Sequence, residues 1–185
     1  MHEQKTSTLR FHYWSQAALW TGFIYITLYL VRPICRFLQA HTPFQTLIFI
    51  LMLVILGSLT CVFFRKNHVI TLNRVIFFGA VLLCYAFGMF LVTIPEERVH
   101  FLQYGLMAFF IYRASILDLK HWQGIVFTLI LTALAGLGDE CIQHILPNRY
   151  FQWKDVLLNA VSGALGLGMT LCLRVGQTCD GDSVN

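Results

Sequence analysis

The chain has 185 residues, of which 57% are hydrophobic and 12% are charged, and its formal net charge is +4. Soluble domains usually carry about a quarter of their residues as Asp, Glu, Lys or Arg, so this composition excludes an ordinary soluble enzyme domain. The positive charges are dispersed, and the longest basic run is Arg65-Lys66. We therefore expect no nucleic-acid partner.

The apolar residues gather in six blocks, most of them long enough to cross a bilayer, which takes about 20 residues of helix. The expected spans are Trp14–Val31, Phe44–Phe64, Val75–Ile94, Val99–Leu117, Gln123–Leu137 and Val156–Leu173. Pro33 is expected to end the first helix, which we take as retained and not as a cleaved signal peptide. The sequence thus predicts an all-α fold, a polytopic transmembrane bundle of about six spans. Its single transmembrane domain covers residues 14–173, between a polar N-tail (1–13) and a polar C-tail (174–185).

The positive charges predict the orientation, because cytoplasmic loops are enriched in Lys and Arg. With six spans, the side that holds both termini carries Lys5, Arg10, Arg65, Lys66, Arg74, Arg113, Lys120 and Arg174. The opposite side carries Arg32, Arg36, Arg98, Arg149 and Lys154. The excess favours cytoplasmic N- and C-termini.

Polar residues gather at the start of the fourth span. It opens with Glu96, Glu97 and Arg98, followed by His100, and Tyr104 lies one turn deeper. Glu96, His100 and Tyr104 are spaced by four and therefore share one helical face, and Glu97 precedes His100 by three.

A second polar group closes the fifth span. Glu140 and His144 continue a row of four-residue steps from Gly136, and Gln143 lies on the neighbouring row. Gly136 lets another helix approach closely beneath Glu140. A turn at Pro147-Asn148-Arg149 follows.

The sixth span begins with polar residues as well. Asp155 is expected to cap this helix, and Asn159 follows one turn later, with Gly163 below it. Ala160, Ala164 and Gly168 form a second face of small residues suited to tight helix packing.

Two spans separate the polar groups, so they emerge on the same side of the membrane. Taken singly, Asp155 is explained as a cap, Arg149 as an anchor reaching the headgroups, and Asn159 as an interhelical donor. Together they indicate a shared polar cluster. Its candidate residues are Glu97, Arg98, His100, Tyr104, Glu140, Gln143, Arg149, Asp155 and Asn159.

The sequence gives little support for a metal or cofactor. Glu140 and His144 face the same way with His100 nearby, but the paired-His motif of helical zinc hydrolases is absent, and hydrogen bonding explains these histidines equally well. The six cysteines form no closely spaced pair. We expect neither a metal nor a cofactor.

These residues, in this order, resemble the VanZ family. The family pattern is a charged pair and a His opening one helix, then Glu-x-x-Gln, a Pro-x-Arg turn, an Asp, an Asn and glycines. Here it is Glu97-x-x-His100, Glu140-x-x-Gln143, Pro147-Asn148-Arg149, Asp155, Asn159 and Gly163. The match runs from Pro95 to Gly168, with Glu96-Glu97-Arg98 where the family often has Asp-Lys.

The resemblance implies a bacterial integral membrane protein, and it supplies no established reaction. The member that gives the family its name is associated with low-level resistance to teicoplanin, a lipid-anchored glycopeptide. We expect an inner-membrane protein whose polar cluster binds an anionic lipid head or a lipid-linked envelope intermediate, with Arg98 and Arg149 meeting phosphate or carboxylate. Buried Glu140 should be protonated or matched by an arginine or a protonated His.

Two alternatives stay open. The first is an intramembrane enzyme that acts on a lipid-linked substrate with Glu140 and His100 as acid and base. The CAAX-protease-like version of this alternative fails, because that family's Glu-Glu-x-x-x-Arg spacing does not fit Glu96-Glu97-Arg98. The second is a structural assembly partner in which the polar cluster only locks helix packing. The sequence does not indicate an oligomeric state.

Overall fold

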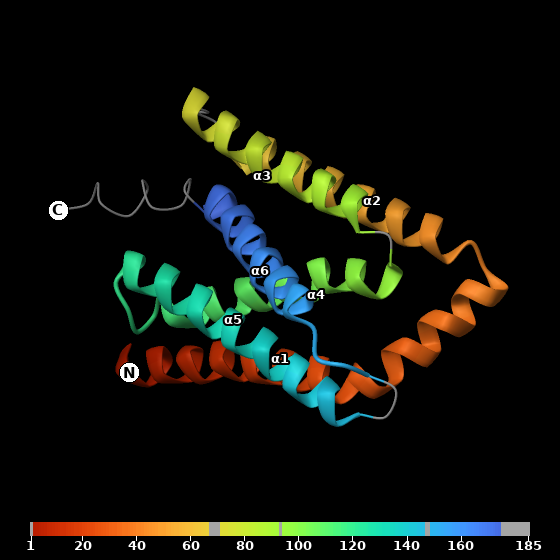
Figure 1. The fold of residues 1–185 in the computed structure, drawn as a ribbon. Helices are drawn as coiled ribbons and strands as arrows, with labels where there is room; N and C mark the ends of the chain where they lie inside the picture. Colours follow the sequence, from red (N-terminus) through yellow and green to blue (C-terminus); the bar gives the residue numbers. More distant parts are fainter. Residues whose placement is uncertain (1, 67–70, 93, 147–148, 175–185) are drawn as a thin grey trace.

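The computed structural model describes residues 2–66, 71–92, 94–146 and 149–174, and the regular structure within these ranges is entirely helical. The elements are α1 (His2–His41), α2 (Phe44–Lys66), α3 (Leu72–Leu91), α4 (Pro95–Ser115), α5 (His121–Ile145) and α6 (Trp153–Arg174), shown in Figure 1. The all-α prediction is confirmed. The predicted C-tail lies almost wholly outside the described residues.

Four helices are long and apolar enough to cross a membrane, namely α2 over Phe44–Arg65, α3 over Leu72–Leu91, α5 over His121–Ile145 and α6 over Trp153–Leu173. The two arms of α1, Thr6–Val31 and Pro33–His41, add a fifth if they form one bent span. Within the described ranges α4 does not meet these criteria. The structure thus supports a membrane protein with four or five candidate spans, fewer than the six predicted.

The position of α4 explains why it differs from the other helices. It runs through the middle of the bundle and packs against α1, α2, α5 and α6 (Figure 1). Its polar residues, among them His100 and Arg113, are partly buried against protein. A helix covered by other helices does not need the apolar surface that lipid demands.

Two helices run further than their apolar blocks predicted. α1 is helical from His2 and continues through Pro33, where its arms meet at 57°, so the prediction that Pro33 ends this helix was wrong. A proline inside a helix removes one hydrogen bond and bends the axis without necessarily ending it. α5 continues past Leu137 to Ile145, because Asp139, Glu140 and Gln143 point into the bundle and not into lipid.

Small residues let α4, α5 and α6 approach closely. A Cβ on Gly166 would collide with the backbone of Gly105, including its carbonyl oxygen at 2.5 Å. A Cβ on Gly136 would lie 2.8 Å from Asn159 Cβ, and one on Gly163 would clash with Thr132. The close approach predicted at Gly136 is confirmed, whereas a Cβ on Gly168 would meet a side-chain methyl group of Val81 on α3 at 3.3 Å, a tight contact but not a clash.

Contacts between α1 and the rest fix the two ends of the bundle. At one end Arg10 Nε lies 2.5 Å from Asp118 Oδ1, in the turn between α4 and α5. At the other end Arg149, in the loop between α5 and α6, donates to the Leu28 carbonyl at 3.3 Å. The start of α4, the end of α5 and the start of α6 therefore meet at the second end, which carries the polar residues.

Candidate functional site

A buried carboxylate, Asp139, is the centre of the polar residues. Its Oδ2 accepts a hydrogen bond from Tyr104 Oη at 2.8 Å and a longer one from Asn159 Nδ2 at 3.5 Å. Its Oδ1 accepts from Gln143 Nε2 at 2.9 Å. His100 Nδ1 lies 3.8 Å from Oδ2, close enough for an ion pair if the imidazole is protonated. Helices α4, α5 and α6 thus converge on one carboxylate.

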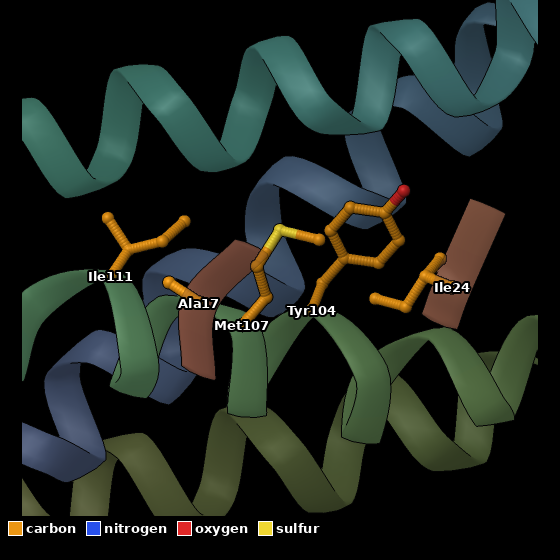
Figure 2. Packing of buried hydrophobic residues seen from close by; sticks show 5 residues of the cluster. All are labelled: Ala17, Ile24, Tyr104, Met107 and Ile111. Carbon is orange, nitrogen blue, oxygen red and sulfur yellow. The ribbon is translucent and has the colours of Figure 1, made fainter. Parts of the chain in front are cut away.

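Packing on α4 aims Tyr104 at this carboxylate. Figure 2 shows its ring beside Met107 and Ile24, with the hydroxyl pointing toward α5. Ala17 and Ile111 complete this apolar cluster between α1 and α4. Because the ring is fully buried among apolar side chains, its hydroxyl needs a polar partner, and Asp139 supplies it.

An arginine continues the network toward α1. Arg149 Nη1 donates to Gln143 Oε1 at 2.5 Å, and Nη2 donates to the Leu28 carbonyl oxygen at 3.3 Å. Gln143 in turn donates to Asp139. The guanidinium is therefore linked to the central carboxylate through one amide side chain.

Glu140 lies beside this network, fully buried as Asp139 is. Its Oε2 accepts from the backbone N–H of Gln152 at 3.0 Å, which holds the α5–α6 loop against the end of α5. The charges of Asp139, Asp155 and Arg149 all act on it. Glu140 has no arginine or His within salt-bridge distance in the described part of the chain.

Several buried atoms here lack a hydrogen-bond partner in the described chain. They are His100 Nδ1, Glu140 Oε1, Asp155 Oδ1 and Asn159 Oδ1, with Thr132 Oγ1 one layer deeper. Most buried polar atoms in folded proteins are paired, so a group of unpaired ones in one place requires an explanation. A bound molecule or ordered water would supply the missing partners.

An ion pair forms the rim of the cluster. Lys154 Nζ lies 3.2 Å from Glu97 Oε1, joining the start of α6 to the start of α4. Glu97 and Asp155 both act on His100 electrostatically. We call Glu97, His100, Asp155 and Lys154 the rim, and Tyr104, Asp139, Glu140, Gln143 and Asn159 the buried centre.

A family model described as VanZ/LLP1 matches residues 3–174. The chain belongs to the VanZ/LLP1 family. The predicted resemblance is confirmed, and it extends beyond residues 95–168 to include α1, which contributes the Leu28 carbonyl to the network. No curated protein and no solved structure matches the chain.

In this VanZ/LLP1 chain the predicted candidates fall into three groups. His100, Tyr104, Gln143 and Asn159 lie around Asp139. Glu97, Glu140, Arg149 and Asp155 border them, as described above. Arg98 is turned elsewhere, with Nε donating to the Val92 carbonyl at 2.8 Å.

Some details of the sequence prediction were wrong. Asp155 lies inside the first turn of α6 and is not its cap, because the helix begins two residues earlier at Trp153. His144 is exposed and does not join Glu140. The side chain of Glu96 lies outside the described part of the structure.

No group of three or more His, Cys, Asp or Glu in the described chain is placed to hold a metal ion.

Asp139 itself was missed as a site residue. The prediction followed four-residue steps from Gly136 to Glu140 and His144, but each such step drifts by about 40° around a helix of 3.6 residues per turn. The buried face of α5 therefore includes Asp139 and Gln143 beside Thr132, Gly136 and Glu140. Spacings of three and four taken together would have found Asp139.

Proposed function

We propose that this VanZ/LLP1 protein binds the polar head of an envelope lipid or lipid-linked component at the cluster around Asp139, in the bacterial inner membrane. The observation that carries the proposal is the set of unpaired oxygens on Glu140 and Asn159, whose side chains are fully buried. Each unpaired buried group costs about 1–3 kcal/mol, so a cluster built only for packing would pair them.

The arrangement of the helices supports a place at the membrane surface for this cluster. If α4 crosses as a helix shielded by its neighbours, and α1 crosses as one bent span, the chain makes six crossings. The Lys and Arg distribution then puts the termini in the cytoplasm and the cluster on the outer side. A headgroup in the outer leaflet lies at that level. We expect this protein to change the susceptibility of the cell to teicoplanin, a lipid-anchored glycopeptide.

The test is to identify lipids that co-purify with the protein after mild detergent extraction, by mass spectrometry, for the parent and for Asp155→Asn. Asp118→Asn is the matched control, because Asp118 is a carboxylate at the opposite end of the bundle, bound to Arg10 and Trp14. We expect one lipid class enriched with the parent and the control and lost with Asp155→Asn. The same lipid profile for all three proteins would contradict the proposal.

A second candidate is an intramembrane enzyme with Glu140 and His100 as acid and base. The observation in its favour is the position of the His100 imidazole, whose Nδ1 lies 3.8 Å from Asp139 Oδ2, because a nearby carboxylate stabilises the imidazolium that forms when a His takes up a proton. Incubation of the protein in vesicles of bacterial lipid extract distinguishes the two functions. A lipid whose mass changes with the parent but not with His100→Ala would support catalysis, and unchanged lipids would support binding.

A further inference from the structure

The unpaired atoms define the chemistry that the cluster lacks. Glu140 Oε1, Asp155 Oδ1 and Asn159 Oδ1 are all acceptors, and none has a donor in the described chain. Glu140 and Asn159 are both 0% exposed. A carboxylate or amide oxygen is satisfied by an N–H or O–H group and not by another oxygen. The other two unpaired atoms, Thr132 Oγ1 and an unprotonated His100 Nδ1, can accept as well. The missing partner of the three oxygens is therefore a donor.

The charged residues of the cluster also indicate that the missing partner is a donor. Glu97, Asp139, Glu140 and Asp155 bring four carboxyl groups to this end of the bundle. Arg149, which is linked to Asp139 through Gln143, donates to the Gln143 and Leu28 oxygens. Arg98 donates to a backbone carbonyl, that of Val92. Arg98 and Arg149 thus donate to protein oxygens, while two of the unpaired oxygens belong to the carboxyl groups of Glu140 and Asp155. This arrangement favours a cation over a phosphate.

The chain already places a primary ammonium at the rim. Lys154 Nζ lies 3.2 Å from Glu97 Oε1, and the side chains are 68% and 13% exposed. Asp155 interacts electrostatically with both residues. An ion pair with one exposed partner is worth only about 0–1 kcal/mol, so another ammonium displaces Lys154 at little cost.

The surroundings of the rim favour a lipid as the source of that ammonium. Ile94, Trp153 and Leu157, which flank Glu97 and Lys154 along α4 and α6, are exposed apolar residues. In a membrane such residues face acyl chains, and a Trp at a helix end is typical of the headgroup level. A head that enters here keeps its tail in the bilayer.

We infer that the bound head carries a primary ammonium, as in phosphatidylethanolamine, which displaces Lys154 from Glu97 and donates to the unpaired oxygens of Asp155, Glu140 and Asn159. The inference rests on the proposed function and names the class of its ligand.

Two lipids that differ only at nitrogen test this inference. Phosphatidylethanolamine has three N–H donors where phosphatidylcholine has three N-methyl groups, and both keep the phosphate and the acyl chains. Binding of each lipid to the full-length detergent-solubilised protein is measured by native mass spectrometry. We expect phosphatidylethanolamine to bind about tenfold more tightly, the ratio that one good charged hydrogen bond provides.

Variants at the rim sharpen the test. Lys154→Gln removes the competing ammonium from an exposed position, so phosphatidylethanolamine should bind several-fold more tightly while phosphatidylcholine does not change. Glu97→Gln should weaken phosphatidylethanolamine binding. Arg10→Gln is the control, because it removes a cation at the opposite end, paired with Asp118, and should change neither lipid. Melting temperatures of all variants verify that the fold is kept.

Several results would overturn the inference. Equal binding of the two lipids, with both lost in Asp155→Asn, would refute the ammonium and leave the proposed function standing. A preference for phosphatidylglycerol that is lost in Arg149→Gln would show an anionic head instead. Soluble ethanolamine binding as tightly as the lipid would refute the lipid source. If no variant in the cluster changed the binding of any lipid, the proposed function would fall as well.

Discussion

At the scale of single residues, Asp139 holds the site together. Its carboxylate accepts hydrogen bonds from Tyr104 on α4, Gln143 on its own helix α5, and Asn159 on α6. One carboxylate thus orients three side chains. In a buried network each donor depends on its acceptor, because no water replaces a lost partner. Asp139 also lies close to the His100 ring through Oδ2 and is linked to Arg149 through Gln143, which donates to Oδ1.

Replacing this carboxylate should destabilise the protein strongly. Asp139→Ala leaves the donors of Tyr104 and Gln143 without their acceptor, at about 1–3 kcal/mol for each buried group. We expect a loss of about 2–5 kcal/mol in the free energy of unfolding, measured by denaturant titration in detergent. Cys141→Ala, exposed on the same helix, is the control and should change stability by less than about 0.5 kcal/mol. Equal stability of Asp139→Ala and the control would show that the network is not formed.

The sequence predicted the neighbours of Asp139 but not Asp139. Tyr104, Gln143 and Asn159 were found because polar groups at helix ends are conspicuous in an apolar chain. Asp139 was passed over because Glu140 next to it fits a strict four-residue spacing, and only the packed structure shows which of two adjacent carboxylates points at α4. The partners of Arg149 were equally hidden, since a backbone carbonyl such as that of Leu28 leaves no trace in the sequence.

At the scale of helices, the approach of α4 to α6 positions the site. Gly105 and Gly166 bring these two backbones into direct contact, and Tyr104 and Asn159 are carried on the same pair of helices. Close packing through small residues is a principal source of helix association in lipid, where burial of apolar surface gives little driving force. The sequence predicted a close approach at Gly136 and a small-residue face at Ala160, Ala164 and Gly168, but not the Gly105–Gly166 contact.

A methyl group at this contact should separate the helices. Gly166→Ala places a Cβ against the backbone of Gly105, which cannot move aside as a side chain would, so we expect a loss of about 1–3 kcal/mol or more. Gly79→Ala on α3 is the matched control, because a Cβ there meets nothing within 4 Å. Its helix should be unchanged or stabilised by about 0.5–1 kcal/mol.

Melting temperatures of the two glycine variants in the same detergent provide the comparison. If Gly166→Ala melted no lower than Gly79→Ala, the close contact between α4 and α6 would not exist in the membrane protein.

At the scale of the whole molecule, apolar blocks predicted the helices well and their ends less well. Each predicted span corresponds to one helix, because a helix that faces lipid must be rich in apolar residues and is therefore visible in the sequence. The blocks failed where protein covers a helix. α4 is less apolar than a lipid-facing span, and α5 continues over polar residues, because both turn their polar side chains toward other helices.

Reporter fusions test the proposed six crossings. Fusions at Asn67 and Asn185 should report the cytoplasm and a fusion near Asn148 the periplasm, because the proposed crossings alternate and the side of the termini carries more Lys and Arg. A fusion near Asn148 on the same side as Asn67 would rule out six crossings and move the cluster away from the outer surface.

Binding of a headgroup by the cluster, as opposed to a role in helix packing alone, can be tested with one variant. Glu140→Gln tests it, because glutamine keeps an acceptor for the Gln152 N–H but replaces the unpaired oxygen by an amide N–H and removes the charge. Lipid occupancy by native mass spectrometry and the melting temperature are measured on one preparation. If the cluster binds a headgroup, lipid occupancy should fall severalfold while the melting temperature stays within a few degrees of the parent's. Unchanged occupancy, with or without a lower melting temperature, would contradict headgroup binding.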